Sequence, residues 1–131
     1  MNMNIRELEK YSDYAYAFLR IMAGWMFAFH GMQKIFGILS TFQAPVGTQP
    51  WIGGIIEMVG GILILIGFQT RIAAFISSGE MAVAYIQFHW KLQMDSNILP
   101  TINKGELAVM YCFLFLYIAS RGAVKWGVDK S

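Results

Sequence analysis

The sequence predicts an all-α protein, a four-helix transmembrane bundle, and three observations lead to this prediction. Hydrophobic residues make up 56% of the 131 residues and charged residues only 14%, whereas about 25% are charged in a typical soluble domain. The mean hydropathy is +0.49. Four continuous apolar segments each approach the roughly 20 residues that a helix needs to cross a bilayer. A soluble domain of this length has too little interior to bury so many apolar side chains.

The four apolar segments cover residues 14–36, 51–68, 71–90 and 106–120, within a single domain over residues 1–131. They lack the period-two alternation of membrane strands, and helices satisfy their own backbone polar groups in lipid. A tight turn is predicted between the second and third segments, because Gly67 suits a helix end and Thr70 suits a helix start. The other two connections are longer and contain prolines.

Positive charges predict the orientation of the segments. With the N-terminus inside, seven of the ten Lys and Arg residues lie on the cytoplasmic side. Lys34, Lys91 and Lys104 lie on the outer side. Arg20 is expected to snorkel to the cytoplasmic leaflet and anchor the first segment there. Both termini are therefore predicted in the cytoplasm, with the two longer loops outside.

Small residues predict that the first two helices are neighbours. Gly53, Gly60 and Gly67 are each seven residues apart in the second segment, and Gly24 and Gly31 have the same spacing in the first. Small residues at this spacing let helix backbones approach closely in lipid. A contact with a second copy of the chain is the alternative use of this surface.

Polar side chains within the apolar segments are costly in lipid and mark functional candidates. With a rise of about 1.5 Å per residue and alternating helix directions, most of them fall in the outer half of the bilayer. Arg20 and Glu80 are also polar residues within apolar segments, and Glu80 lies near the middle of its segment. The candidate ligand-binding or proton-relay residues are His30, Gln33, Lys34, Glu57, Gln87, His89 and Glu106.

Glu57 lies on the close-packing face of its helix, so its carboxylate needs a partner or a proton. We expect Lys34 or His30 to be that partner. Structural explanations compete with the functional one: Lys34 and His89 would reach the headgroups, and Glu106 would complement the helix dipole. Gln87 would join two helices by a hydrogen bond, and a pair of Glu57 with Lys34 or His30 would only hold the bundle together.

The sequence identifies no catalytic residue and predicts no metal site. The candidate acids and histidines come from separate helices and lack the HExxH or ExxH spacing of metal-binding helices. Cys112 is the only cysteine, which excludes an internal disulfide or a thiolate cage. Ten basic residues are balanced by eight acidic ones, so no nucleic-acid partner is predicted. The many aromatic residues suit a flat apolar ligand such as a quinone.

Short motifs, in order along nearly the whole chain, carry a family resemblance. They are Leu19–Ile21, His30–Gly37, Glu57–Gly61, Gly67–Ala74, Glu106 and Arg121–Asp129. Together they resemble the DoxX family, small four-helix proteins of the bacterial cytoplasmic membrane. Its founding member is a small subunit of an archaeal thiosulfate:quinone oxidoreductase. Another member is described as joining a sulfurtransferase and a superoxide dismutase in a membrane-associated complex.

This resemblance implies an integral, multi-pass subunit of a quinone-linked oxidoreductase or oxidative-stress system in the bacterial inner membrane. Its expected partners are the lipid bilayer, soluble redox enzymes and a second copy of the chain. In this hypothesis a quinone headgroup occupies a polar pocket in the outer half, where His30 and Lys34 bind it and Glu57 relays a proton. One alternative is a non-catalytic anchor or assembly factor that docks soluble redox enzymes through residues 1–13 and 121–131. A small-solute transporter is the weaker alternative, because no segment is discontinuous.

Overall fold

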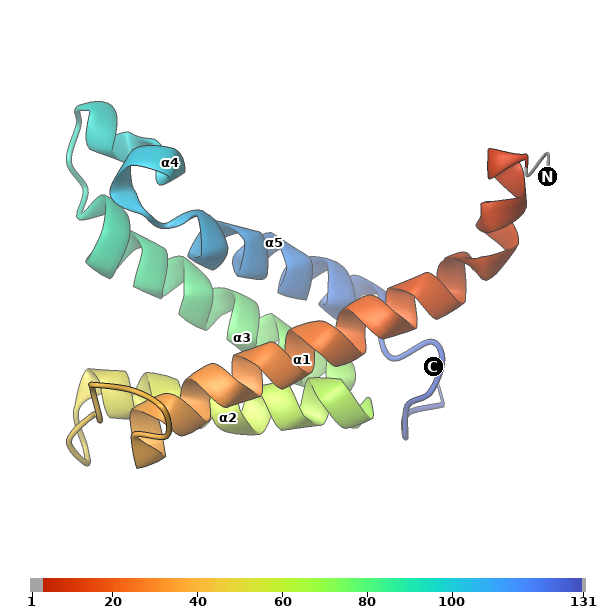
Figure 1. Cartoon of the computed structure of the whole chain (residues 1–131), viewed down its shortest axis with the longest axis horizontal. Helices are drawn as coiled ribbons and strands as arrows, with labels where there is room; N and C mark the ends of the chain where they lie inside the picture. The colour runs from red at the N-terminus through yellow and green to blue at the C-terminus, as the bar shows by residue number, and fades with distance from the viewer. Residues whose placement is uncertain (1–3, 131) are drawn as a thin grey trace.

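The computed structural model describes residues 4–130, and its regular elements are all helices (Figure 1). The four long helices are α1 (Ser12–Phe36), α2 (Gln49–Ile66), α3 (Thr70–Ala84) and α5 (Glu106–Arg121). The shorter elements are a 3₁₀ helix (Ile5–Tyr11), a π-helix (Tyr85–Trp90), a second 3₁₀ helix (Ser96–Ile98) and α4 (Pro100–Asn103). The predicted all-α class is confirmed for the described residues.

The long helices begin and end within two residues of the predicted apolar segments, once the π-helix is counted as the continuation of α3. The predicted tight turn is also present, because Gly67 takes a left-handed conformation after α2 and α3 begins at Thr70. By length and hydropathy alone, one helix of the described chain, Gln49–Ile66, is long and apolar enough to cross a membrane. The helices α3 and α5 have 15 and 16 residues.

The long helices pack as two antiparallel pairs, α1 with α2 and α3 with α5, with α2 also in contact with α3 (Figure 1). Within the first pair the backbones touch. A Cβ atom on Gly24 would lie 2.7 Å from the carbonyl oxygen of Gly61, and one on Gly31 would lie 2.6 Å from that of Gly54. Because nothing larger than glycine fits there, the predicted contact between the first two helices is confirmed within one chain.

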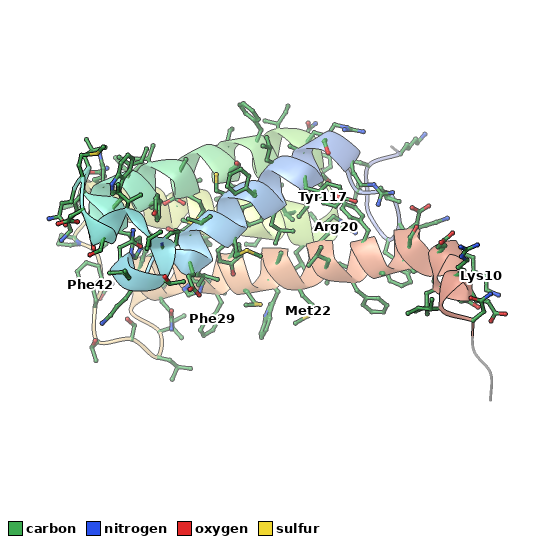
Figure 2. All side chains as sticks on the ribbon, turned by 90° about the horizontal axis from the view of Figure 1, so that it is seen from above. Lys10, Arg20, Met22, Phe29, Phe42 and Tyr117 are labelled. Atoms are coloured by element: carbon green, nitrogen blue, oxygen red, sulfur yellow. The ribbon has the colours of Figure 1, made fainter. Side chains whose placement is uncertain are left out.

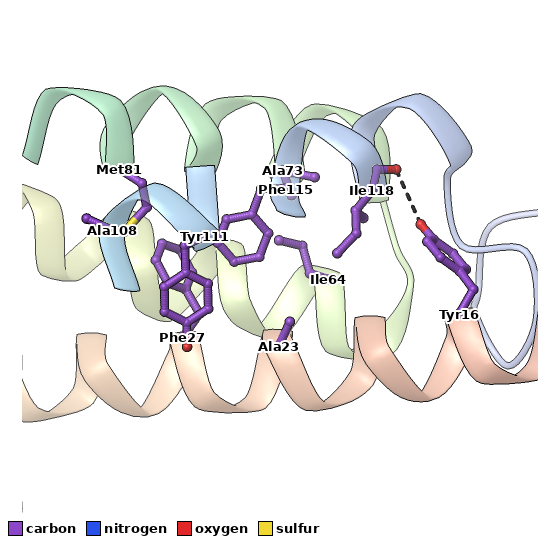
Figure 3. Packing of buried hydrophobic residues seen from close by; sticks show 11 residues of the cluster. Tyr16, Ala23, Phe27, Ile64, Ala73, Met81, Ala108, Tyr111, Phe115 and Ile118 are labelled. Atoms are coloured by element: carbon purple, nitrogen blue, oxygen red, sulfur yellow. Dashed lines mark hydrogen bonds between the residues drawn. The ribbon is translucent and has the colours of Figure 1, made fainter. Parts of the chain in front are cut away.

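An aromatic core lies between α1 and α5 (Figure 3). The ring centroids of Phe27 and Phe115 are 4.6 Å apart, and the Tyr111 ring stacks on Phe115 at 5.2 Å with an interplanar angle of 7°. Ile64 and Ile118 extend this core toward the end of the molecule that holds both termini. The core therefore fixes the aromatic rings of α5 against α1.

Large apolar side chains also cover the outside of all four long helices, as the full side-chain view shows (Figure 2). Met22 of α1 points away from the other helices, and Ile62, Phe75 and Phe113 on α2, α3 and α5 are 44%, 65% and 65% exposed. A bundle that is surrounded by water places polar residues on such faces, whereas a helix that is apolar all round is typical of lipid or of a large interior.

Both described chain ends lie at one end of the bundle, which we call the terminal end (residues 12–20, 64–71 and 118–130) (Figure 1). There the Arg20 side chain is completely buried. Its guanidinium donates to the carbonyl oxygens of Ile64 and Leu65 at 2.6 and 3.1 Å, and to those of Lys125 and Trp126 at 2.8 and 3.0 Å. The expectation that Arg20 anchors the leaflet is wrong, because this side chain instead ties the end of α2 to the C-terminal tail.

The tail also caps helix α3. The carboxylate of Asp129 accepts hydrogen bonds from the backbone N–H of Gln69 and Thr70, at 3.0 and 2.9 Å, and from the Thr70 hydroxyl at 2.7 Å. The backbone N–H of Asp129 donates to Gly67. Hydrogen bonds from Thr70 hold the pKa of Asp129 below its usual value. An acid far along the chain thus replaces the local N-cap side chain that helices usually have.

Candidate ligand-binding site

A cavity of about 660 Å³ opens at the opposite end of the bundle, which we call the loop end (residues 27–57 and 76–111). It lies between the α1/α2 pair and the α3/α5 pair, which diverge there (Figure 1). Its volume is in the range of small-molecule sites, about 300–1,000 Å³. Most of the lining is apolar, and all four long helices contribute to it. The polar lining residues are His30, Lys34, Gln49, Glu57, Glu80, His89, Lys104 and Tyr111.

An ion pair between Lys34 of α1 and Glu57 of α2 lies in the wall of the cavity, with 2.5 Å between Nζ and Oε2. Glu57 is 3% exposed and Lys34 is 34% exposed. Gly54 makes this pair possible, because a Cβ atom there would lie 2.9 Å from the Cβ of Lys34. Of the two expected partners of Glu57, the structure brings Lys34 to it, while the His30 ring lies edge-on to Tyr111.

A second carboxylate, that of Glu80 on α3, approaches Glu57 across the space that Gly53 leaves. A Cβ atom on Gly53 would lie 3.0 Å from Glu80 Oε1 and 3.6 Å from Glu57 Oε2. The cluster therefore contains two carboxyl groups and one ammonium group. In an apolar wall, two neighbouring carboxylates cannot both stay charged beside a single cation, so such a cluster can hold an exchangeable proton.

His89 and Gln87, two of the predicted candidates, lie on the π-helix at the rim of the cavity. His89 lines it, with Nδ1 at 3.3 Å from the carbonyl oxygen of Asn103. Gln87 does not line it, but its amide oxygen accepts a hydrogen bond from Gln49, which does. This bond links α2 to the π-helix across the mouth of the cavity. Gln87 therefore joins two helices by a hydrogen bond, which is the structural explanation given for it from the sequence.

Gln33 and Glu106, the remaining candidates, are not brought to the cavity. The Gln33 amide faces the loop after α1 and donates to the carbonyl oxygen of Leu39 at 3.4 Å. Glu106 is exposed in the first turn of α5, where a negative charge complements the helix dipole. The structure thus gathers four of the seven candidates around one cavity and places Gln33, Gln87 and Glu106 outside its lining.

Glu80 and Tyr111 are lining residues that the candidate set omits. The signal for Glu80 was present in the sequence, because an acid near the middle of an apolar segment is as costly as Glu57. Tyr111 gives no comparable signal, since tyrosine is common in apolar helices. Among residues 4–130, no group of three or more His, Cys, Asp or Glu side chains is arranged to hold a metal ion.

Comparison with known proteins gives the family of the chain. The family model for DoxX matches residues 15–90, which is more than half of the chain and includes Lys34, Glu57 and Glu80. A Haemophilus influenzae (strain ATCC 51907 / DSM 11121 / KW20 / Rd) protein, described as an uncharacterized protein, is 42% identical over 131 residues. That similarity covers 96% of each chain. No solved structure matches this chain.

Proposed function

Because the chain belongs to the DoxX family of membrane proteins, we propose that it crosses a bacterial inner membrane four times with both termini in the cytoplasm. The spans are α1, α2, α3 with its π-helical continuation to Trp90, and α5. Two observations support this topology. Apolar side chains cover the outside of every long helix, and seven of the ten basic residues lie on the cytoplasmic side in this orientation.

In this topology we propose that the loop-end cavity binds a small amphiphile of the quinone class. The chain would then be a membrane subunit of a quinone-linked redox or oxidative-stress system. The observation that carries the proposal is an apolar cavity whose wall holds the Lys34–Glu57 ion pair and Glu80. The cavity also reaches the outer surface between α2 and α3, where Ile52 and Ile76 both line it and are half exposed. A ligand dissolved in the lipid has a route to the polar cluster there.

The residues of the cluster have different roles in binding a quinone. The ammonium of Lys34 and the ring of His30 face the carbonyl oxygens of the headgroup, and Glu57 exchanges a proton through its partner Lys34. Reduction of a quinone to a quinol takes up two electrons and two protons. The cluster provides the proton path, and a partner redox enzyme supplies the electrons.

Quinone binding is testable with purified protein in nanodiscs titrated with decylubiquinone. We expect saturable binding to the wild type and binding about tenfold weaker in two variants. Lys34→Met removes a charge-assisted contact to the quinone, and Glu57→Gln removes the carboxylate that holds Lys34 in place. Lys91→Met and Glu106→Gln are matched controls at the same end of the molecule, outside the cavity lining, and should bind like the wild type. Non-saturable partitioning into the wild-type nanodiscs, equal to that into empty ones, contradicts the proposal.

A second function, docking of a soluble redox enzyme, is favoured by one observation at the terminal end. The tail is fixed in place by Arg20 and Asp129 yet leaves Trp126 and Val128 more than half exposed. Trp126 packs against the rings of Tyr14 and Phe18. Residues 1–3 of the proposed leader and Ser131 of the proposed tail lie outside the described residues. Exchange of Val128 for Asp should release a co-purifying partner without changing decylubiquinone binding.

A further inference from the structure

Four buried side-chain atoms in the described part of the chain have no hydrogen-bond partner, and two of them share the loop-end cavity. These two are Oε2 of Glu80 and the hydroxyl of Tyr111. The other two, Nε of Arg20 and the hydroxyl of Ser77, do not line it. Buried polar groups in native proteins nearly always have a partner. Two orphaned groups from different helices, facing one cavity, therefore indicate that a ligand supplies the partner.

The position of Tyr111 is fixed, so its hydroxyl cannot swing away to find another partner. The residue is 5% exposed, and its ring stacks on Phe115 and packs against Phe27. Tyr111 and Glu80 are both lining residues of the cavity, and the hydroxyl of Tyr111 is buried without a partner. A tyrosine held in this way is a preorganised hydrogen-bond donor.

We propose that Tyr111 and a protonated Glu80 both donate hydrogen bonds to the ligand and so select an uncharged molecule with carbonyl oxygens. The inference deepens the proposed function and rests on it, since it concerns the ligand of the same cavity. It assigns ligand contact to two residues outside the Lys34–Glu57 pair. That pair uses the one ammonium group of the cluster, which leaves none to stabilise an ionised Glu80.

The proton on Glu80 follows from its surroundings. Glu57 is already neutralised by Lys34 at 2.5 Å, and a second negative charge on the far side of Gly53 would face Glu57 in an apolar wall. The ionisable groups that face Glu80 across the cavity are His30 and Lys34 on α1, Glu57 on α2, His89 on the π-helix, Lys104 before α5, and Tyr111 on α5. Lys104 is exposed, so water screens its charge.

Two donors on neighbouring helices, α3 and α5, that line one cavity discriminate between ligands by chemistry. A carbonyl oxygen accepts both hydrogen bonds and needs no acceptor in return, whereas a hydroxyl group also brings a proton that must be accepted by an oxygen of Tyr111, Glu80 or Glu57. A cationic amine would require Glu80 to lose its proton. The cavity should therefore bind the oxidised quinone more tightly than the corresponding quinol.

Three substitutions test the roles of these residues in decylubiquinone titrations of the nanodisc-embedded protein. Glu80→Gln keeps both the size and a donor, so binding should stay within about threefold of the wild type. Glu80→Met and Tyr111→Phe each remove a donor and should weaken binding about tenfold. Glu106→Met and Tyr117→Phe are matched controls, because both residues are exposed and lie outside the cavity lining.

The pH dependence and the infrared spectrum give independent readouts of the proton on Glu80. Wild-type affinity should fall as alkaline pH removes this proton, while the affinity of Glu80→Gln should not change with pH. The wild type without ligand should show the carbonyl stretch of a protonated carboxylic acid, and Glu80→Gln should lack it. If this band is missing from the wild type, the inference is overturned whether or not the quinone binds.

The binding results separate the failure of this inference from the failure of the proposed function. If the wild type binds decylubiquinone but Glu80→Met and Tyr111→Phe bind equally well, Glu80 and Tyr111 are not ligand contacts and the proposed function stands. If Glu80→Gln loses binding as strongly as Glu80→Met, Glu80 acts as an anion and the ligand class is wrong. If the wild type does not bind, both the proposed function and this inference fail.

Discussion

The two ends of the bundle bury ionisable side chains in opposite ways. At the terminal end, Arg20 is fully buried, and four carbonyl oxygens from α2 and the tail accept its hydrogen bonds. At the loop end, Glu80 and Tyr111 keep polar atoms for which the described chain provides no partner. Burial of a charge is costly in both places. The difference lies in what offsets the cost: at the terminal end the chain pairs all of the Arg20 guanidinium except Nε, and at the loop end the proposed ligand would supply the missing partners.

The two ends also differ in packing, which is tight at the terminal end and open at the loop end. At the terminal end the tail fills the space beside the α2–α3 turn so closely that a Cβ atom on Gly67 would lie 2.6 Å from the Cα of Gly127. At the loop end the two helix pairs diverge (Figure 1), and a Cβ atom on Gly79 would have no neighbour within 4 Å. A closed end and an open end on one scaffold are what a rigid support and a binding site require.

The largest effect is expected from Arg20→Met compared with Lys34→Met, which remove one cation from each end. Arg20→Met leaves four carbonyl oxygens unpaired and removes one of the two side chains that hold the tail, so it should lower the free energy of unfolding by about 3–5 kcal/mol. Lys34→Met should cost only about 1–2 kcal/mol, because it removes a single ion-pair contact from a side chain that is 34% exposed. Thermal unfolding in detergent micelles, followed by circular dichroism, measures both losses.

Arg20→Lys is the control for charge alone. A single ammonium cannot reproduce the forked geometry of a guanidinium that contacts two separate backbone segments, so most of the loss should remain. The comparison between the ends is broken if Lys34→Met is as destabilising as Arg20→Met, because the loop-end cluster would then be structural.

Much of the scaffold was predictable because local patterns encode it. Continuous apolar runs placed the four long helices, Gly67 and Thr70 placed the turn, and the repeat of Gly24 and Gly31 predicted the α1–α2 contact. The partner of Glu57 was narrowed to two residues by helix spacing and depth. These features depend on side-chain pattern within a helix or between neighbouring helices.

The unpredicted features depend on long-range contacts to backbone groups. Arg20 binds carbonyl oxygens more than forty residues away, and Asp129 caps a helix that begins 59 residues earlier. Every residue has a backbone carbonyl group, so no sequence pattern predicts which of them a side chain will contact. The role of Tyr111 likewise depends on the divergence of two helix pairs, which only the packed structure reveals.

An intermediate effect is expected from two matched glycine substitutions at the loop end. A Cβ atom on Gly31 would lie 2.6 Å from the Gly54 carbonyl oxygen, so Gly31→Ala should push α1 from α2 and cost about 1–3 kcal/mol. Gly79→Ala meets no atom and should stabilise α3 by up to about 1 kcal/mol. Opposite shifts in melting temperature would show that the loop end is open between the helix pairs and tight within them. Equal shifts would contradict this.

The smallest effect is a pH-dependent contribution from Asp129 at the terminal end. Hydrogen bonds from the backbone and side chain of Thr70 lower the pKa of this carboxyl group in the folded protein. Its stabilisation is therefore complete above the unfolded pKa, about 3.9, and is lost as the pH falls through the lower folded value. At pH 7, Asp129→Asn should cost about 1 kcal/mol, as expected for a helix cap that is partly exposed.

Melting curves of the wild type and Asp129→Asn between pH 7 and about pH 3 measure this contribution. The difference between them should be constant down to about pH 5 and should shrink below pH 4. Asp95→Asn is the matched control, since Asp95 caps a short loop helix through Asn97 at the other end. If the wild type and Asp129→Asn melt alike even at pH 7, the tail is held by Arg20 and its backbone contacts alone. The closed end would then depend on one buried cation, and the contrast with the carboxyl-rich open end would be sharper still.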